Sequence, residues 1–584
     1  MVSGKDGVVF SVWAPHASAV SVVGDFNDWD KSAHPLGREG DVWSVRVSSA
    51  KVGSEYRFIL ATAQGELEKN DPRALAMTHS AGASVVVDHA SFDWEDDASF
   101  LPPARNELVI YEMHLGTYFR GGNKQEPGTF DDAIERLDHL VDLGVNAIEL
   151  MPIVEFAGGI SWGYNPAAPF AVESDYGGVE GLKRFVKECH ARGIAVILDV
   201  VYNHFGPGDL DLWQFDGWEE NGKGGIYFYN DWRSSTPWGE SRPDYGRPEV
   251  RQYLRDNALM WFEDYHVDGL RFDMTFYIRS TDDGREIAEG WALSQWINDE
   301  IRQRYPRAIV IAEDLHSNEW LTKSTGEGGA GFSSQWDEQF VHPVRAMLIR
   351  QDDEDRSIDA TVGALTFRYN EDVFERVIYT ESHDEVANGK SRVPTEVDAY
   401  DQEGYWAGKR SSLGACLVMT APGIPMIFQG QEVLTTGYFK DSSEFRWENT
   451  ETHAGIFRLY RDLIALRSDR EGKGRALTTP ELEILHANHV EKLLVFSRGN
   501  DEEGRFLVVV NLTNRAWEHY RFPVPHEGRW ILLFKADAAV YSDLFGSTEA
   551  SSIDAEAIPM DGREFSAATG VGSYDCLIFA ASDE

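Results

Sequence analysis

Three acidic residues stand at the ends of apolar, strand-like runs: Asp273 ends GLRFD, Glu313 ends IVIAE, and Asp384 follows RVIYTESH. They are 40 and 71 residues apart, so only the fold could bring them together. A carboxyl group in such a place is partly withdrawn from water, which raises its pKa and makes an acid available near neutral pH. One such residue alone could equally be a helix cap or a loop ion pair. Three of them favour an acid–base site, and each has a polar neighbour of its own: Arg271, Asp314 and His383.

The runs that carry these carboxyls belong to a repeated pattern of strand and helix. Amphipathic segments predict helices between the apolar runs: DDAIERLDHLVDLG, VEGLKRFVKECHARG and PEVRQYLRDNALMWFEDY. The first two end in Gly, a common helix stop. Eight strands alternating with helices over roughly 360 residues predict an α/β fold, a (β/α)8 TIM barrel with its chemistry at the C-terminal strand ends. A doubly wound sheet would carry a glycine-rich turn after its first strand, and none is visible. The expected strands are LVIYEM, AIELMP, AVILDVV, GLRFDM, AIVIAED, a short segment before Gln335-Trp336, RVIYTES and PMIFQG.

The barrel pattern is flanked by two regions of short β-strands. Residues 1–100 predict a β-sandwich carbohydrate-binding module. The acidic, proline-containing stretch SFDWEDDASFLPPARNEL predicts the linker to the barrel. Residues 101–474 form the predicted catalytic barrel. Residues 475–584, with LLVFSR, FLVVVNL, WILLFK and CLIFA, predict a C-terminal β-sandwich domain.

The composition of the chain excludes several classes of protein. The chain has 584 residues, of which 42% are hydrophobic and 26% charged, as expected for a globular protein. It has no apolar run long enough for a membrane helix, no secretory signal pattern and only three cysteines, so a cytoplasmic location is expected. A net charge of −43 repels phosphate backbones and anionic lipids, so no nucleic acid and no membrane is expected as a partner. A salt-adapted cytoplasm and an ordinary acidic enzyme both fit this charge.

Four ordered motifs carry a resemblance to a known family. They are DVVYNH at 199–204, GLRFD at 269–273, AED at 312–314 and ESHDE at 381–385. With these motifs the sequence resembles the α-amylase superfamily, glycoside hydrolase family 13, over nearly its whole length. The resemblance implies a retaining α-glucan-active enzyme, in which Asp273 is the nucleophile that forms a covalent glycosyl-enzyme. Glu313 is then the general acid and base, and Asp384 stabilises the charged, flattened transition state.

The same resemblance assigns supporting roles. Arg271 would keep the nucleophile ionised, with Asp199 supporting Arg271, while His204 and His383 would bind sugar hydroxyls. Tyr164 in SWGYNP would stack under the same sugar ring. Asn203 occupies the position of a calcium ligand in many amylases, but one asparagine cannot specify a site of six to eight oxygens. No metal and no cofactor is therefore predicted.

The N-terminal stretch FSVWAPHASAVSVVGDFNDWD resembles a family 48 carbohydrate-binding module, with Trp13, Phe26 and Trp29 as candidate sugar-stacking rings. The ESHDEVANGK segment resembles branching enzymes, whereas DVVYNHFGP is more similar to the corresponding segment of trehalohydrolases and other hydrolases. We therefore expect a 1,4-α-glucan branching enzyme, with α-1,4-glucan (amylose, glycogen or maltodextrin) as substrate. The alternatives are a malto-oligosyltrehalose trehalohydrolase, an α-amylase-type hydrolase and, remotely, a non-catalytic glucan-binding protein.

Overall fold

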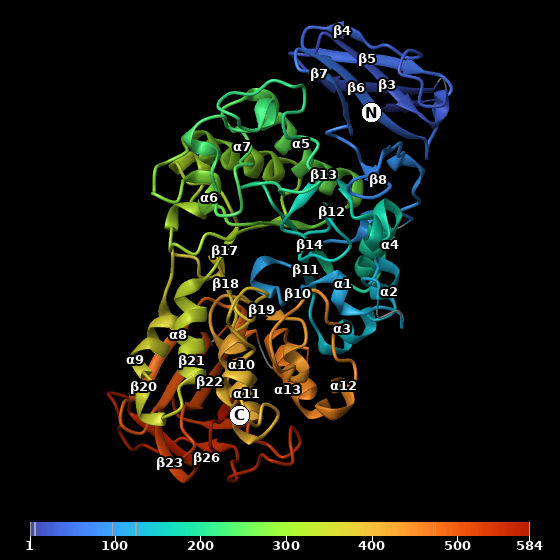
Figure 1. The fold of residues 1–584 in the computed structure, drawn as a ribbon. Helices are drawn as coiled ribbons and strands as arrows, with labels where there is room; N and C mark the ends of the chain where they lie inside the picture. The colour runs from blue at the N-terminus through green and yellow to red at the C-terminus, as the bar shows by residue number, and fades with distance from the viewer. Residues whose placement is uncertain are drawn as a thin grey trace.

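The computed structural model describes residues 2–4, 7–95, 97–122, 125–470, 472, 475–500 and 502–582. Figure 1 shows an N-terminal β module in blue and a C-terminal β domain in red, with the barrel and its helices between them. Within the described ranges, no helix is both long and apolar enough to cross a lipid bilayer.

The centre of the molecule is a closed barrel of parallel strands, which confirms the predicted fold. Each expected apolar run forms one strand, and every residue of the eight strands is buried, as in a sheet that helices cover outside and side chains fill inside. In barrel order the strands are β10 (Ile110–Met113), β11 (Ala147–Leu150), β14 (Ala195–Val200), β15 (Gly269–Phe272), β16 (Ile309–Ala312), β17 (Ser334–Trp336), β18 (Arg376–Ile378) and β19 (Ile424–Phe428).

Helices cover the outside of the barrel (Figure 1). The segment DDAIERLDHLVDLG, which reads as one helix, forms two, because the chain tightens into a turn at Arg136, whose amide bonds the carbonyl of Ala133. The guanidinium of Arg136 lies over the rings of Phe119 and Trp447, so this turn is packed against the protein. The principal helices are α2 (Phe130–Ile134), α3 (Leu137–Leu143), α4 (Gly178–Ala191), α5 (Pro248–Tyr265), α7 (Ala288–Arg304), α8 (Glu338–Ile349), α9 (Ile358–Thr366), α10 (Val393–Val397), α11 (Tyr405–Thr420) and α13 (Ala454–Arg467).

The N-terminal module contains two antiparallel sheets. Phe26 stacks on Phe10 at 5.4 Å, and Trp13 meets Tyr227 of the barrel edge-on, so neither ring is a free surface platform. Trp29 is 40% exposed. One sheet holds β1 (Val2–Gly4), β2 (Gly7–Trp13), β5 (Val42–Val47) and β4 (Gly37–Glu39), and the other β3 (Ala19–Gly24), β6 (Glu55–Thr62), β7 (Gly65–Lys69), β9 (Ser84–Val85) and β8 (Ala76–Met77).

The segment between this module and the barrel is fixed by a buried ion-pair chain. Asp97 lies 2.6 Å from Nδ1 of both His190 and His266, and Nε2 of His190 lies 2.9 Å from Asp268. Burial alone would lower the pKa of His190, but the two carboxylates raise it to about 9. The connection therefore packs firmly on α4 and on the start of β15.

The C-terminal domain is a six-stranded antiparallel sheet faced by a two-stranded one. A buried ion pair between Lys409 of α11 and Asp537 joins it to the barrel. The strands are β20 (Leu482–Asn488), β21 (Leu493–Asn500), β22 (Gly504–Asn511), β27 (Cys576–Ala581), β24 (Arg529–Lys535) and β25 (Ile553–Asp554), with β23 (Trp517–Val524) paired to β26 (Phe565–Val571).

Candidate active site

The barrel register brings the predicted carboxyls together. Asp199 on β14 is the register partner of Arg271 on β15, so both side chains point to the same side of the sheet. The backbone amide of Asp273 bonds Val200, and that of Glu313 bonds Phe272, both at 3.0 Å. Asp273 and Glu313 therefore leave adjacent strands at the same level, at the C-terminal end of the barrel.

Arg271 is the hub of this site. Its guanidinium is fully buried, with Nη1 at 2.5 Å from Asp199 and 3.2 Å from Asp273. Nη2 lies 2.6 Å from Oε2 of Glu313, and the group packs over the ring of Trp336 at 4.2 Å. A buried cation is tolerated when it is paired and hydrogen-bonded, and here one guanidinium serves three carboxyls.

Glu313 has the environment of a general acid. The residue is 1% exposed, and burial raises the pKa of its carboxyl to about 8 against the opposing charge of Arg271. The amide of Met274 donates to Oε2 at 2.9 Å, from a residue whose φ of 35° lies in the left-handed region that side chains rarely adopt. Both contacts use Oε2, so the other oxygen can carry the proton.

Asp199 and Tyr164 form one wall of the site. The Tyr164 hydroxyl donates to Asp199 at 2.5 Å, and its ring stacks on that of His383 with centroids 5.0 Å apart. Burial raises the pKa of Asp199 to about 6, although Arg271 opposes the shift. The predicted support of Arg271 by Asp199 is thus present as a direct contact.

Asn203 holds the candidate nucleophile. Its amide donates at 2.7 Å to both the backbone and a side-chain oxygen of Asp273, and its own oxygen faces Nδ1 of His204. Nε2 of His204 faces the Tyr164 carbonyl at 3.0 Å, and the ring stacks on Trp238 at 4.6 Å. Both nitrogens of His204 therefore already face protein oxygens. Across the described residues, no group of three or more His, Cys, Asp or Glu side chains is arranged to hold a metal ion.

His383 is positioned by a buried glutamate. Glu112 on β10 accepts from His383 Nδ1 at 2.5 Å and from its backbone amide at 3.1 Å. Nε2 lies 3.4 Å from Asp384, whose side chain is 42% exposed and faces the open end of the barrel. Burial would lower the pKa of His383, but Asp384 and Glu112 raise it to about 9. At neutral pH the ring is thus a cation that can donate from both nitrogens.

The sequence analysis did not predict three contacts of the site. Glu112 accepts from His383, Asn203 donates to Asp273, and Trp336 packs against Arg271. Glu112 did leave a signal, because it is an acidic residue inside the expected strand LVIYEM. The structure also separates Asp314 from the site, since its carboxylate turns to Thr275 and Arg279. The other predicted site residues lie together around Arg271 and His383.

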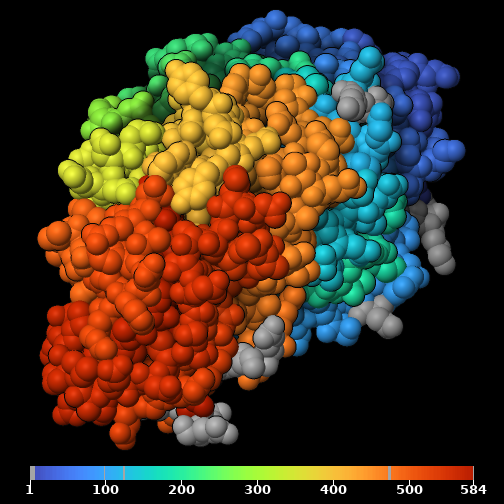
Figure 2. Space-filling model, turned by 90° about the horizontal axis from the view of Figure 1, so that it is seen from below, coloured from blue at the N-terminus to red at the C-terminus, as the bar shows by residue number. Residues whose placement is uncertain are grey.

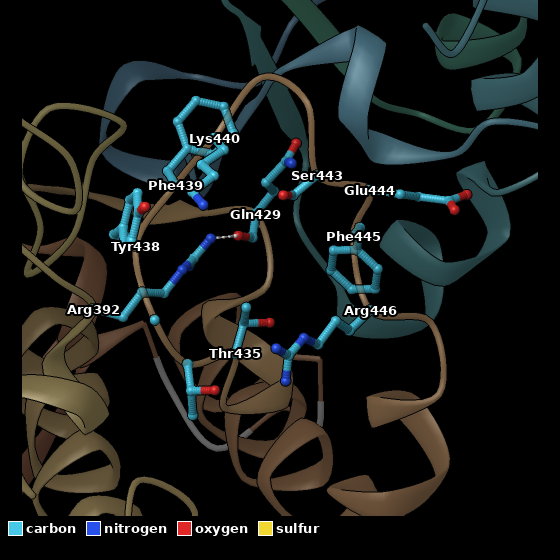
Figure 3. Close-up of a pocket in the computed structure, with 12 residues that line it drawn as sticks. Arg392, Gln429, Thr435, Tyr438, Phe439, Lys440, Ser443, Glu444, Phe445 and Arg446 are labelled. Carbon is cyan, nitrogen blue, oxygen red and sulfur yellow. Dashed lines mark hydrogen bonds between the residues drawn. The ribbon is translucent and has the colours of Figure 1, made fainter. Parts of the chain in front are cut away.

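A pocket of about 230 Å³ opens beyond the end of β19, next to this site (Figure 3). Arg392 and Gln429 line its inner side, where the guanidinium donates to the Gln429 carbonyl at 2.7 Å. Phe439 lies between this pocket and the site, because it packs on Trp162, whose ring meets His383 edge-on. The exposed Tyr438 stands at the outer side. The pocket is therefore a neighbour of the site, from which the ring of Phe439 separates it.

The barrel fold and the carboxyls at its strand ends agree with the family that the sequence motifs indicated, and comparison with known families gives the same result. Residues 115–210 and 213–471 match the alpha amylase catalytic domain, residues 1–74 match carbohydrate-binding module 48 (isoamylase N-terminal domain), and residues 484–582 match the alpha amylase C-terminal all-beta domain. The chain belongs to the α-amylase family, as the sequence motifs predicted.

Particular relatives within that family are 1,4-alpha-glucan branching enzymes. The enzyme of Vibrio cholerae is 32% identical, over 92% of this chain and 76% of its own length. That of Oceanobacillus iheyensis is 30% identical, over 92% of this chain and 87% of its own. A pullulanase of Anoxybacillus, solved in complex with maltotetraose, shares the fold with a TM-score of 0.78 at 18% identity, over 100% of this chain and 87% of the other.

Proposed function

We propose that the protein is a 1,4-α-glucan branching enzyme that works through a covalent glycosyl-enzyme. The observation that supports retaining chemistry is the shared contact of Asp273 and Glu313 with one guanidinium, because that chemistry needs two carboxyls side by side. The observation that supports branching is the identity with branching enzymes over most of the chain.

In the first step, a carboxylate oxygen of Asp273 attacks the anomeric carbon of a glucose unit in an α-1,4-linked chain. The bond between the anomeric carbon and the glycosidic oxygen breaks, and Glu313 gives its proton to that oxygen. The part of the chain on the reducing-end side therefore leaves with a free 4-hydroxyl, while the other part stays bound to Asp273. A raised pKa keeps this proton on Glu313 at neutral pH. His383 and Asp384 lie 3.4 Å apart, and both can form hydrogen bonds with hydroxyl groups of the bound sugar ring.

In the second step, the ionised Glu313 takes a proton from the 6-hydroxyl of a glucan chain. The 6-oxygen attacks the anomeric carbon, the ester to Asp273 breaks, and an α-1,6 branch forms. A water molecule in place of the 6-hydroxyl would give hydrolysis. The partition between the two depends on how well the site excludes water while the acceptor chain arrives.

The test is incubation with amylose, with iodine colour, reducing ends and α-1,6 linkages read together. Branching lowers iodine colour with few new reducing ends and creates linkages that a debranching enzyme releases. Abundant new reducing ends would replace branching by hydrolysis, and free trehalose from a trehalose-capped maltodextrin would indicate a trehalohydrolase. No change with any substrate would leave a binding protein.

A further inference from the structure

The turn that follows β15 is fastened to the segment that follows β16, directly beside the two reacting carboxyls. Asp273 begins this turn, and the amide of Thr275, two residues later, donates to the carbonyl of Glu313 at 2.6 Å. The next residue after Glu313 is Asp314, whose side chain is fully buried and contacts the turn and the helix after it. Asp314 stands beside the general acid, but the two proposed steps give it no role.

Two side chains hold the carboxylate of Asp314. Nε and Nη2 of Arg279 donate to its two oxygens at 2.9 and 2.7 Å, which is the bidentate geometry of a strong ion pair. The Thr275 hydroxyl lies 3.0 Å from Oδ2 of Asp314 and 2.9 Å from the Glu313 carbonyl, so its single proton can bond either oxygen. Arg279 is the last residue of the short helix α6 (Phe276–Arg279). One buried carboxylate therefore ties the turn and this helix to the end of β16.

The middle residue of the turn, Met274, has a backbone conformation that needs support. Its φ of 35° lies in the left-handed region, which a residue with a side chain occupies only where the surrounding structure holds it there. In this conformation its amide donates to Oε2 of Glu313 at 2.9 Å. Nη2 of Arg271 lies 2.6 Å from the same oxygen. Because both groups face Oε2, the other oxygen of Glu313 is left to carry the proton that goes to the glycosidic oxygen.

Aromatic rings cover the ion pair between Asp314 and Arg279. The ring of Phe276 stacks on that of His316 with centroids 4.0 Å apart, and the guanidinium of Arg279 lies over Phe276 at 5.0 Å. Nδ1 of His316 lies 2.6 Å from the carbonyl of Asp314 and 3.7 Å from its carboxylate. The side chain of Arg279 is 22% exposed and that of Asp314 is not exposed at all. A pair so covered is screened little by salt, so the link is firmer than an ordinary surface ion pair.

The nucleophile at the start of the turn has supports of its own. Asn203 donates at 2.7 Å to both the backbone and the carboxylate of Asp273, and the amide of Asp273 donates to the carbonyl of Val200 at 3.0 Å. None of these contacts includes Asp314. A looser turn should therefore disturb the hydrogen bond to the general acid more than it disturbs the nucleophile.

The turn lies on the side of the barrel away from the C-terminal domain. In Figure 1, α6 and α7 stand at the opposite end of the barrel from the red strands. In Figure 2 the red C-terminal domain lies against the yellow and gold surface of the barrel, and the green surface, which has the colour of the residues after β15, lies beyond it. Changes in the turn should therefore act on the active site without disturbing the contact between the two domains.

We propose that Asp314 is a positioning residue for the general acid. It keeps the turn at Met274 closed, and the Met274 amide then fixes which oxygen of Glu313 carries the proton. The proposal rests on the proposed function for the role of Glu313, and it holds equally for branching and hydrolysis, because both begin with the same proton transfer. It requires that a change at Asp314 impairs protonation of the leaving oxygen while attack by Asp273 continues. A role in stability alone would give a loss that does not depend on the leaving group.

The test compares two substrates that differ in their need for an acid. Cleavage of amylose requires protonation of the leaving oxygen, whereas α-maltoheptaosyl fluoride releases fluoride as an anion, with the electron pair of the broken bond, and needs no acid. For both substrates kcat/KM reports the steps up to the glycosyl-enzyme. In the full chain, Asp314→Asn should lower kcat/KM about 30-fold for amylose and less than threefold for the fluoride. A loss below threefold on amylose, or equal losses on both substrates, would overturn the proposal.

Variants of the two donors test the same link if Asp314→Asn lowers the melting temperature. Thr275→Val removes the hydroxyl, and Thr275→Ser, which keeps it, is the matched control. Arg279→Lys keeps the charge but loses the bidentate geometry. Thr275→Val and Arg279→Lys should each lose about tenfold on amylose and less than threefold on the fluoride, whereas Thr275→Ser should retain activity on both. Asp283→Asn removes an exposed ion pair with Arg285 in the next loop and should change neither rate.

Glu313→Gln separates a failure of this proposal from a failure of the proposed function. It should lose about 10³-fold on amylose and far less on the fluoride, because a general acid contributes about 10²–10⁴-fold. If Glu313→Gln shows this difference and Asp314→Asn does not, the role proposed for Asp314 is wrong and the general acid stands. If Glu313→Gln loses both substrates equally, Glu313 is not the acid, and the proposed mechanism fails together with the role of Asp314.

Discussion

Replacing Glu112 by Gln tests whether the charge on His383 is needed for catalysis. The amide keeps an oxygen that can accept from the ring at 2.5 Å, so the geometry is preserved while the negative charge is removed. With Nδ1–H directed at residue 112, only the protonated ring can also donate from Nε2 towards a sugar hydroxyl. A neutral ring would present a lone pair there instead.

The size of the effect follows from the buried pair. Both side chains are 2% exposed, and two charges about 4 Å apart at an effective dielectric constant near 20 interact by about 4 kcal/mol. That energy equals about three pKa units, which would lower the pKa of His383 from about 9 to about 6. In the wild type, activity should fall as pH rises through about 8, where Glu313 loses its proton. In the variant, His383 loses its proton first, and only about 1% of the rings are still protonated at pH 8, so kcat/KM at that pH should fall about 100-fold.

The assay is the pH profile of kcat/KM on amylose between pH 5 and 9. Glu149→Gln is the matched control, because Glu149 is the register partner of Glu112 on β11. Burial raises the pKa of Glu149 well above its usual value, so it is already neutral and the amide should change little. If Glu112→Gln lowers activity equally at pH 6 and pH 8, with an unmoved basic limb, the charge argument is wrong and Glu112 acts only through packing.

Three other predictions follow from the same structure. Asp273→Asn should lower turnover at least about 10³-fold with an unchanged melting temperature, and activity within tenfold of wild type would remove Asp273 from its role. The raised pKa of His190 contributes up to about 3 kcal/mol of stability, which is fully present below pH 6.5 and lost as pH rises through about 9; urea unfolding at pH 6 and 10 should show this loss, and His190→Gln should abolish it. At a net charge of −43, melting temperature should rise with NaCl from 0.05 to 2 M while KM for glucan changes little, and a flat melting curve would exclude salt adaptation.

The fold could be predicted from the sequence because the apolar residues recur at clear spacings and the strand and helix patterns alternate regularly along the chain. The segment PEVRQYLRDNALMWFEDY forms α5 with the predicted bounds, Pro248–Tyr265, since proline at a helix start and a steady apolar face both favour it. The candidate site was accessible in part, because Asp273 and Glu313 end consecutive strands, and parallel strands end at the same edge of a barrel. A polar residue at the end of an apolar strand is therefore enough to predict a candidate site residue in a barrel of this kind.

What the sequence could not show is which buried carboxyls are charged. Glu112 and Glu149 occupy equivalent positions in expected strands, and both are 1% exposed. Only the fold reveals that Glu112 faces His383, while an oxygen of Glu149 has no hydrogen-bond partner. The same limit applies to Arg271. Its position two residues before Asp273 predicted that these two side chains would lie close together, but its contact with Glu313 depends on the register between β15 and β16.

The protonation states explain how an acidic cluster can favour a positively charged transition state. Around the sugar site, Arg271 is balanced by Asp199 and Asp273, and the charge of His383 is balanced by Glu112. Glu313 is neutral before the reaction, so it adds no negative charge that would hinder proton donation. As it gives up its proton, it becomes an anion beside the developing positive charge at the anomeric carbon. The chemistry itself thus supplies the stabilising charge at the moment it is needed, and the buried partners keep the surrounding charges fixed.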